Sequence, residues 1–405
     1  MSHQPRALFY SHDTLGLGHL RRTLLLCAGL GERFHDLSIL MITGSPMAHA
    51  FRIPPGVDYV KLPSVRKLDN EQYDSRYLRV PFDQTLRLRE QIILQTTANY
   101  EPDFLFVDNV PLGMKGELSP TLEYVRENMP ATRVFLNLRD ILDDAREIVP
   151  LWERLGVFQA LDRYYDLIFI YGLPTVFDPV REYGWPESVR RKTCFCGYIP
   201  RPVDREASRQ ARADLCPDGE KLVMVTVGGG ADGAHVIENY LHALPQITPG
   251  ARVRSLVLLG PEMDSEHSRR LCGAPRSEPV TFLDFCDDPL PYMDAADVVV
   301  SMAGYNTISE ILALQKRAVV VPRTRPRVEQ LIRSSRLQDL GLLRMIHPDE
   351  LSPTRLAGEV TTLLGASGGP VASDLEFSAV DRLASHLGGF LRPDTLTEQG
   401  VSPAT

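Results

Sequence analysis

The amino-acid sequence predicts an α/β protein built from two doubly wound parallel sheets. Short, continuous apolar runs alternate with longer helical patterns along the chain, which is typical of parallel strands that are buried on both faces and connected by helices. The runs form two series on either side of residues 197–203, a segment with one glycine and two prolines that we interpret as a linker. Gly, Pro, Asp or Asn follows most runs, as expected where a strand turns into a helix.

Ten of these runs are expected to be strands, five in each series. Those of the first series are 7–11, 37–42, 104–107, 134–138 and 167–171, and those of the second are 222–227, 255–259, 280–283, 298–301 and 318–321. Ligands bind beyond the carboxyl ends of the strands in sheets of this kind. Two facing halves would therefore place a ligand cleft between them.

The length of the chain predicts two sizeable domains, since 405 residues at roughly 150 residues per domain allow two or three. We expect a first domain over residues 1–198 and a second over residues 204–368. Helical spacing predicts a C-terminal helix within residues 369–391. The polar, aperiodic residues 392–405 are expected to be a disordered tail.

Composition and charge exclude several classes of protein. The 44 basic and 52 acidic residues give a net charge of −8, which argues against a generally basic nucleic-acid-binding protein and leaves a local basic patch open. No run of about 18 apolar residues could span a membrane, and the N-terminal residues lack a signal-peptide core. Six cysteines without a disulfide framework indicate free thiols in a cytoplasmic protein, and Cys194 and Cys196 lack the spacing of a zinc pair.

The first predicted strand runs into a glycine-containing loop and then an apolar helix. Gly16 and Gly18 allow a tight turn and a close approach of the backbone to a ligand. His19 falls in the first turn of the helix, where the helix dipole disfavours imidazolium, so a neutral ring facing a cleft could act as a general base. Two other interpretations stay open: a dinucleotide-binding turn, although the third glycine of G-x-G-x-x-G is lacking, and a capping or surface histidine.

Two strand-to-helix turns of the second series also indicate ligand binding. Residues 228–234, Gly-Gly-Gly-Ala-Asp-Gly-Ala, can direct backbone N–H groups toward a phosphate, although such glycines also serve close packing. Gly304 opens the second turn, and Thr307 or Ser309 can cap the helix that follows. Glu310, just inside that helix, could accept two ribose hydroxyls or simply complement the helix dipole.

The second half of the chain resembles the donor-binding domain of family 28 glycosyltransferases. The matching segments follow in the family's order and are 228–234, 285–288, the strand that ends at residue 301, 304–310 and 329–330. The loop 16–22 is similar to the family's N-terminal glycine-histidine loop and to the Gly-x-Gly-His-x-x-Arg loop of a related nucleotide-sugar hydrolase. Residues 102–111 and 116–120 resemble a bacterial group known only as predicted glycosyltransferases.

This resemblance implies a GT-B fold, in which two facing Rossmann-like domains hold the donor mainly on the C-terminal one and the acceptor on the N-terminal one. The C-terminal helix of this architecture packs back on the first domain. A UDP-linked sugar is the implied donor, and neither a metal ion nor a cofactor is needed. The implied donor-binding residues are Gly18, Gly228, Gly229, Gly230, Asp232, Gly233, Phe285, Cys286, Gly304, Tyr305, Asn306, Thr307, Glu310, Arg323, Glu329 and Gln330.

Within this set, the resemblance implies that the glycine loop lies by the diphosphate, residues 285–288 by the uracil, Glu310 by the ribose and residues 329–330 by the sugar. The chain departs from the family at two places. Glu329-Gln330 stands where the peptidoglycan N-acetylglucosaminyltransferase of the family has Gln-Gln, and Gly230-Ala-Asp232 replaces its serine-glutamine. The donor sugar, the choice between UDP and TDP, and the acceptor therefore stay open.

Sugar transfer needs a stabilised leaving group and a base. The N–H dipoles of the glycine loop, with Arg323 or Arg325, would stabilise the departing diphosphate. His19 is the first candidate for the base that takes the acceptor's proton. Asp108, which follows a buried strand, is the second, although an aspartate there can also serve a turn. The remaining candidates at this edge are Glu117, Arg139 and Asp140.

Residues 61–100 are expected to shape the acceptor site. Basic residues are interspersed with acidic ones in this segment, which indicates a solvated mixed surface rather than an anionic or membrane-facing site. A peripheral membrane contact stays open. Tyr73 and Tyr77 lie four residues apart and could cover a sugar or simply pack.

Three functions fit these residues. The favoured one is a glycosyltransferase that moves a sugar from a nucleotide-diphosphate donor to an unknown acceptor, without metal and with inversion. A nucleotide-sugar hydrolase or epimerase on the same fold fits the loop around His19 almost as well, with water or an enzyme base in place of the acceptor. A non-catalytic nucleotide-sugar-binding protein would bind the donor without turnover.

Overall fold

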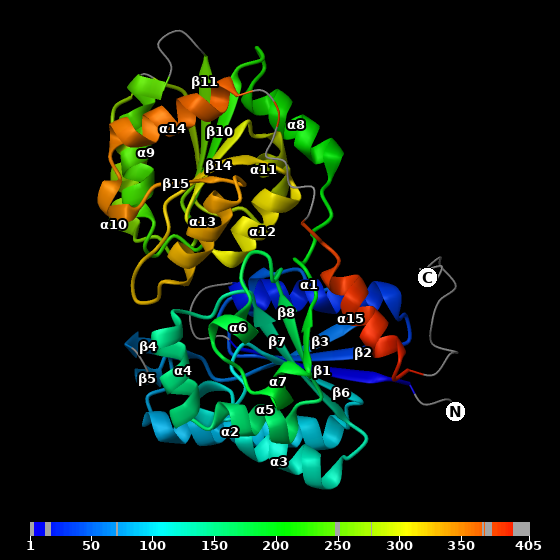
Figure 1. Cartoon of the computed structure of the whole chain (residues 1–405). Coiled ribbons are helices and arrows are strands. Elements are labelled where there is room, and N and C mark those ends of the chain that lie inside the picture. Colours follow the sequence, from blue (N-terminus) through cyan, green and yellow to red (C-terminus); the bar gives the residue numbers. More distant parts are fainter. Residues whose placement is uncertain are drawn as a thin grey trace, which may run out of the picture. The chain divides into compact units, whose positions relative to one another are not determined.

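The computed structural model describes residues 4–12, 18–69, 72–247, 252–276, 278–366, 368 and 375–391. The chain divides into two compact units. Unit 1 consists of Met1–Asp140, Ala145–Ile199 and Glu376–Thr405, and unit 2 of Ile141–Asp144 and Pro200–Leu375. Each unit is built around a parallel sheet (Figure 1). The expected fold class, two doubly wound α/β units, is confirmed.

In its described residues, unit 1 has a seven-stranded sheet in the order β3-β2-β1-β6-β7-β8-β9, and neighbouring strands are parallel. The order changes direction between β1 and β6, so the loops that follow these two strands meet at the switch point where such sheets bind ligands. A separate antiparallel pair consists of β4 (Val65–Asp69) and β5 (Gln72–Ser75). The sheet strands are β1 (Arg6–Ser11), β2 (Ser38–Thr43), β3 (Val57–Lys61), β6 (Phe104–Asp108), β7 (Arg133–Arg139), β8 (Leu167–Tyr171) and β9 (Thr193–Phe195).

The helices of unit 1 include α15 (Ala379–Gly388), which packs on α1 (Gly18–Arg33). A Cβ at Gly29 would lie 2.5 Å from Val380 Cγ1, so only glycine permits this approach. An ion pair between Arg33 and Asp381 joins the same two helices. The other helices are η1 (Ala48–Ala50), α2 (Phe82–Tyr100), η2 (Met114–Gly116), α3 (Ser119–Asn128), α4 (Ala145–Arg154), α5 (Val157–Tyr164), α6 (Pro179–Glu182) and α7 (Glu187–Arg190).

A fully buried ion pair ties α2 to the loop after β6. Arg89 donates from Nε and Nη2 to the two carboxylate oxygens of Glu117, each at 2.6 Å. Tyr10, on β1, donates its hydroxyl to the same carboxylate at 2.5 Å. The side chain of Glu117 is 0% exposed, so the expectation that it faces a ligand is wrong. Breaking such a buried pair leaves an uncompensated charge, which makes it a rigid anchor of this edge.

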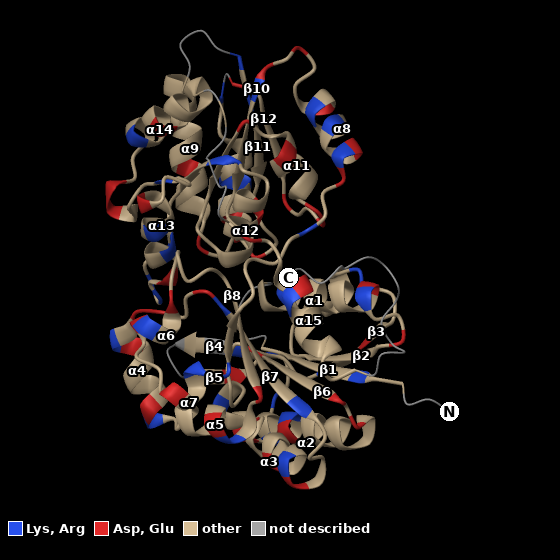
Figure 2. Ribbon diagram, turned by 45° about the vertical axis from the view of Figure 1, so that its right-hand side comes forward, with Lys and Arg blue, Asp and Glu red and all other residues tan. Residues whose placement is uncertain are grey.

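Unit 2 has, in its described part, a six-stranded parallel sheet in the order β12-β11-β10-β13-β14-β15. Its strands are β10 (Lys221–Thr226), β11 (Val253–Leu258), β12 (Val280–Leu283), β13 (Val298–Ser301), β14 (Arg317–Val320) and β15 (Arg344–Met345). Its helices are α8 (Arg205–Leu215), α9 (Ala234–Ile247), α10 (Ser265–Gly273), α11 (Leu290–Ala295), α12 (Tyr305–Ala313), α13 (Glu329–Asp339), η3 (Pro348–Glu350) and α14 (Pro353–Gly365). In Figure 2 the charges lie mainly on helices and loops, while the strands are mostly uncharged.

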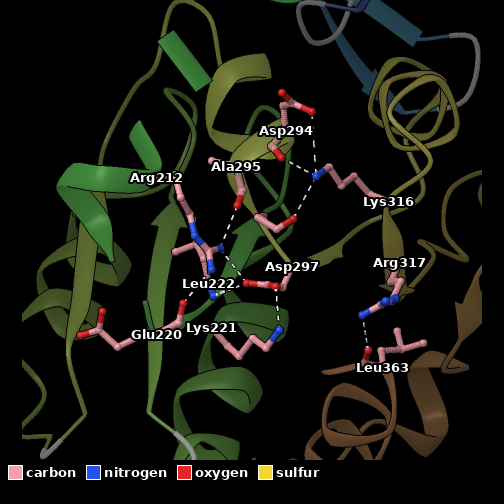
Figure 3. Close-up of polar contacts among 11 residues, drawn as sticks. Arg212, Glu220, Lys221, Leu222, Asp294, Ala295, Asp297, Lys316, Arg317 and Leu363 are labelled. Carbon is pink, nitrogen blue, oxygen red and sulfur yellow. Dashed lines mark hydrogen bonds and ion pairs between the residues drawn. The ribbon is translucent and has the colours of Figure 1, made fainter. Parts of the chain in front are cut away.

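An ion-pair network fixes the amino ends of β10 and β13 in unit 2 (Figure 3). Asp297 accepts a hydrogen bond from the Leu222 N–H at 2.8 Å and pairs with Arg212 at 2.6 Å. Lys221 pairs with the same carboxylate at 3.2 Å. Burial alone would raise the pKa of Asp297, but these donors lower it. This edge is therefore occupied by structural contacts, and the loops available for a ligand follow the carboxyl ends of the strands.

The ten expected strands are all present, and their ends differ from the expected ones by at most two residues. The sequence analysis missed β3, β9 and β15 and the β4–β5 pair. These strands are short or lie at sheet edges, where one face stays partly exposed and no continuous apolar run is needed. The expected tail, 392–405, and Gly16 lie outside the described residues. No helix in the described part of the chain is both long and apolar enough to span a membrane.

Candidate functional site

The candidate site of unit 1 lies where β1 and β6 end. His19 lies in the first turn of α1, and Asp108 is the last residue of β6. Nδ1 of His19 and Oδ2 of Asp108 are 2.6 Å apart. An imidazole that donates from Nδ1 to a carboxylate keeps its other nitrogen, Nε2, as the proton acceptor. The sequence analysis treats the two residues as alternative bases, whereas the structure joins them into one pair.

Arg22 completes this cluster from the next turn of α1. Its Nη2 forms an ion pair with Asp108 Oδ1 and lies 3.2 Å from His19 Nδ1. The side chains of Arg22 and Asp108 are 3% and 4% exposed, and that of His19 is 17% exposed. Arg22 belongs to the loop singled out in the sequence, but no role was expected for it. The available signal was the spacing His-x-x-Arg, which places both side chains on one face of a helix.

The charges of the cluster set its protonation. Burial alone would raise the pKa of Asp108, but Arg22 and His19 together hold it well below the usual range, so the carboxylate is ionised at neutral pH. Burial lowers the pKa of His19; Asp108 opposes this effect, while Arg22 and Arg139 add to it. His19 is therefore an uncharged imidazole near neutral pH, which is the form that can accept a proton.

Other polar residues surround this pair at the same edge. The rings of His12 and His19 meet edge to face, with centroids 5.6 Å apart. Asn109, next to Asp108, adopts a left-handed conformation with φ 63° and donates its N–H to the Asn137 carbonyl at 2.8 Å. Non-glycine residues in this conformation are uncommon and cluster at functional sites. Asp140, a candidate from the sequence, is fully buried at the end of β7.

In unit 2, the glycine loop lies between β10 and α9, and close packing explains two of its glycines. A Cβ at Gly230 would lie 2.3 Å from the Leu259 carbonyl oxygen, and one at Gly233 would lie 2.2 Å from Val227 Cβ. Gly230 also has φ 93°, which favours glycine. Gly229 differs, because its φ is not positive and its Cβ would meet only the Glu262 carboxylate, at 2.8 Å.

Four of the expected donor-binding residues come together beside this loop. Arg323 follows β14, and its Nη1 lies 3.4 Å from Asp232 Oδ2. Its Nη2 lies 3.3 Å from Glu329 Oε1, and its backbone N–H donates to Gln330 Oε1 at 3.0 Å. The Glu329 side chain is 3% exposed and that of Arg323 is 34% exposed. A half-exposed guanidinium is thus held between two carboxylates at the carboxyl edge of the sheet.

Asp143 fixes the start of the helix that carries Glu329 and Gln330. Its Oδ1 accepts a hydrogen bond from the Val328 N–H at 2.9 Å, one residue before α13. A carboxylate at a helix N-terminus satisfies a free N–H and complements the helix dipole. The sequence analysis missed this contact because it joins residues 185 positions apart.

Glu310, the expected ribose-binding residue, has an unexpected partner. Its Oε1 pairs with Nη1 of Arg201, and Nη2 of Arg201 donates to Asp288 Oδ1 at 2.7 Å. Arg201 comes from the segment interpreted as a linker, so the sequence offered no reason to join it to Glu310. The arginine connects the helix α12 to the loop after β12, the two places where the ribose and the base are expected.

The turn before α12 is held from α13. Arg333 is fully buried, donates to the Ala303 carbonyl at 3.0 Å and lies 5.7 Å from the centroid of the Tyr305 ring. The expectation that Thr307 or Ser309 caps α12 is wrong, because Gly304 occupies the N-cap position without a side-chain cap bond. Asn306 and Thr307 are half-buried. After β12, Phe285 is 41% exposed and Cys286 is half-buried.

The segment expected to shape the acceptor site exposes several large apolar side chains. Leu68 is 59% exposed and Tyr77 is 67% exposed. Tyr73 instead packs, since its ring stacks on Phe82 with centroids 6.3 Å apart. Ion pairs of Arg66 with Asp74 and of Arg87 with Asp83 neutralise part of the basic charge. This surface is therefore less polar than the sequence indicates; its other exposed apolar residues are Leu78, Val80 and Leu88.

Comparison with known proteins supports the assignment of unit 2. The sequence profile of the glycosyltransferase family 28 C-terminal domain matches residues 223–372. Among curated proteins, the UDP-N-acetylglucosamine--N-acetylmuramyl-(pentapeptide) pyrophosphoryl-undecaprenol N-acetylglucosamine transferase of Haemophilus influenzae is 31% identical over 167 residues, 40% of this chain and 46% of the relative. The chain thus matches about half the length of that relative. The resemblance to family 28 is confirmed over this region.

Solved structures match almost the whole chain at lower identity. The glycotransferase of kitacinnamycin is 15% identical with a TM-score of 0.62, and the match covers 96% of this chain and 100% of the chain of that structure. MurG of Acinetobacter baumannii is 13% identical with a TM-score of 0.59 and covers 95% and 99%. At such identities the likeness shows the fold alone. It confirms the expected GT-B fold.

Gly233 and Gly229 are predicted to respond differently to a methyl group. In Gly233→Ala the added Cβ would overlap Val227, so we expect the free energy of unfolding to fall by about 2 kcal/mol or more. Gly229→Ala meets only a flexible carboxylate and should unfold as the wild type does. Urea unfolding followed by circular dichroism measures both changes. Equal stability of the two variants would contradict the packing role of Gly233.

Proposed function

We propose that this protein is a glycosyltransferase that moves a sugar from a UDP-linked donor to an acceptor hydroxyl, without a metal ion and with inversion at the anomeric carbon. One observation carries the proposal. The glycine loop, Arg323 and Glu329-Gln330 converge at the carboxyl edge of a unit whose sequence matches the family 28 C-terminal domain. The relative from Haemophilus influenzae is named for a UDP-N-acetylglucosamine substrate, which favours UDP as the nucleotide.

The donor diphosphate would lie by the glycine loop. The loop leads into α9, whose first N–H groups and helix dipole favour an anion. Arg323 adds a guanidinium that two carboxylates, Asp232 and Glu329, hold in place. As the bond from the anomeric carbon to the diphosphate breaks, its electron pair moves to the phosphate oxygen, where these donors stabilise the charge.

The nucleoside and the sugar would contact residues on either side of the diphosphate. Glu310 can accept the two ribose hydroxyls, and Arg201 holds its carboxylate in place from the side of Asp288. The exposed ring of Phe285 can stack on the base. Glu329 and Gln330 would offer one carboxylate and one amide to the hydroxyls of the sugar. The peptidoglycan N-acetylglucosaminyltransferase of family 28 has two glutamines, and therefore two amides, at this place. The donor sugar of this chain need not be N-acetylglucosamine.

His19 is the proposed base. Its Nε2 takes the proton of the acceptor hydroxyl as the oxygen attacks the anomeric carbon from the face opposite the diphosphate, which inverts that centre. Asp108 stabilises the imidazolium that forms and holds the ring in the required tautomer.

Nucleotide sugars and free thiols both fit a cytoplasmic protein. The exposed apolar side chains near Leu68 and Tyr77 favour an acceptor with an apolar portion or a peripheral membrane contact.

A nucleotide-sugar hydrolase is the second candidate. The loop around His19 has the His-x-x-Arg spacing of such an enzyme, and the structure places Arg22 within the base cluster. Water would then replace the acceptor on the same Nε2. Release of UDP from a donor panel, measured with and without an acceptor library, separates the two: acceptor-dependent release supports transfer, and acceptor-independent release at the same rate supports hydrolysis.

Removing the Glu310 carboxylate is predicted to weaken nucleotide binding. We expect Glu310→Ala to raise the Kd for UDP about tenfold to a hundredfold, because one or two charge-assisted hydrogen bonds to ribose are lost. Calorimetric titration with UDP measures the change. Glu266→Ala, at an exposed carboxylate of the same unit, is the matched control and should bind as the wild type does. Unchanged affinity in Glu310→Ala would place the ribose elsewhere.

Removing the imidazole is predicted to abolish turnover without affecting the donor. We expect His19→Ala to keep the wild-type Kd for UDP and to lose about a hundredfold to ten-thousandfold in kcat, the usual contribution of a general base. In the wild type, kcat/KM should fall on acidification with a midpoint below the ordinary pKa of histidine, because burial lowers the pKa of His19 and only the neutral ring accepts a proton. His35→Ala, at an exposed histidine, is the control. Preserved turnover in His19→Ala would assign the proton transfer to Asp108 alone.

A further inference from the structure

Arg22 has no role in the mechanism above, although its guanidinium lies 3.2 Å from Nδ1 of the proposed base. It lies three residues after His19 on α1, and both side chains face the end of β6. One oxygen of Asp108 binds His19 and the other binds Arg22. The carboxylate is thus held at both oxygens, and rotation about its Cβ–Cγ bond would break a contact on each side.

We infer that Arg22 is a positioning residue for the base: it clamps the Asp108 carboxylate against His19 and places a positive charge beside the imidazole. This inference rests on the proposed function, because it concerns the base of that reaction. It also assigns a physical task to the arginine of the His-x-x-Arg spacing. Arg22 itself contacts neither the acceptor nor the donor in this scheme.

Burial lowers the pKa of His19 and Asp108 raises it, so the positive charge beside the ring acts together with burial to keep the base neutral. A carboxylate within hydrogen-bonding distance favours the imidazolium form. A ring that is already protonated cannot take the acceptor's proton. The guanidinium of Arg22, 3.2 Å from His19 Nδ1, opposes that effect. The base therefore keeps the orientation that Asp108 provides without being charged at neutral pH.

Within the part of the chain that the structure describes, charged and titratable groups from four elements face His19. Asp108 ends β6, Arg22 lies on α1, Arg139 ends β7, and the His12 ring follows β1 at 5.6 Å between centroids. Arg139 acts in the same direction as Arg22, and Arg22 in addition binds the carboxylate oxygen of Asp108. Removing Arg22 should therefore change both the charge and the geometry of the cluster, and a lysine should restore the charge alone.

The inference can be tested on the free protein by NMR titration of the histidine ring protons. The His19 signals are assigned by their loss in His19→Gln. We expect the His19 midpoint to rise by about one pH unit in Arg22→Gln, since a positive charge within 4 Å has been removed. In Arg22→Lys the midpoint should stay within a few tenths of a unit of the wild type. Arg33→Gln, the same change at the half-exposed arginine in the last turn of α1, is the matched control.

Turnover provides a second readout. In Arg22→Gln and Arg22→Lys we expect kcat to fall at least about tenfold because the Asp108 clamp is lost, while the Kd for UDP stays at the wild-type value. In Arg22→Gln the midpoint of the acid limb of the pH profile of kcat/KM should shift to higher pH by the same amount as the NMR midpoint of His19. Arg22→Lys keeps the buried charge and provides the test if Arg22→Gln does not fold. Its kcat must then fall, while the NMR midpoint of His19 stays at the wild-type value.

The outcomes separate this inference from the proposed function. A shifted midpoint in a protein that fails to bind any nucleotide would support the clamp and reject the transferase. Nucleotide binding and turnover with an unshifted His19 midpoint in Arg22→Gln, equal to that of Arg33→Gln, would reject the clamp and keep the transferase. Wild-type kcat in Arg22→Lys would likewise overturn the positioning role.

Discussion

The buried, ionised carboxylate of Asp108 is the charge on which the candidate site of unit 1 depends. It ends β6 at the switch point of the sheet, where the backbone of β1 and β6 fixes its position. A lone carboxylate in such surroundings would take up a proton. Arg22 and His19 keep it charged, and in return it fixes the tautomer and orientation of His19. The chemistry of this edge therefore follows from one carboxylate that two basic groups share.

Unit 2 meets a different constraint, because the same loops must pack tightly and leave N–H groups available for an anion. Gly230 and Gly233 are required by their neighbours, Leu259 and Val227, so a glycine-rich loop is not by itself evidence of a ligand. The charged side chains beside the loop are what indicates a donor site. Arg323 is held between Asp232 and Glu329, an arrangement that packing alone does not require.

The fold was largely predictable from sequence because buried parallel strands need continuous apolar runs, whereas edge strands such as β9 do not. The candidate site was predictable in its residue types but not in its contacts. His19 and Asp108 were both identified, yet as alternatives, since no periodicity relates residues 89 positions apart. Arg201 and Asp143 were missed for the same reason: each reaches its partner from a distant segment. The predicted cap of α12 failed because glycine occupies that position.

The central claim is that unit 2 binds a UDP-linked donor without a metal ion. Calorimetric titration of the whole chain with UDP, TDP, GDP and ADP, in the presence of EDTA, tests it most directly. UDP is expected to bind to one site per chain under these conditions, and the purine nucleotides at least about tenfold more weakly. Absence of binding by every nucleotide, or binding of UDP only after a divalent cation is restored, would contradict it.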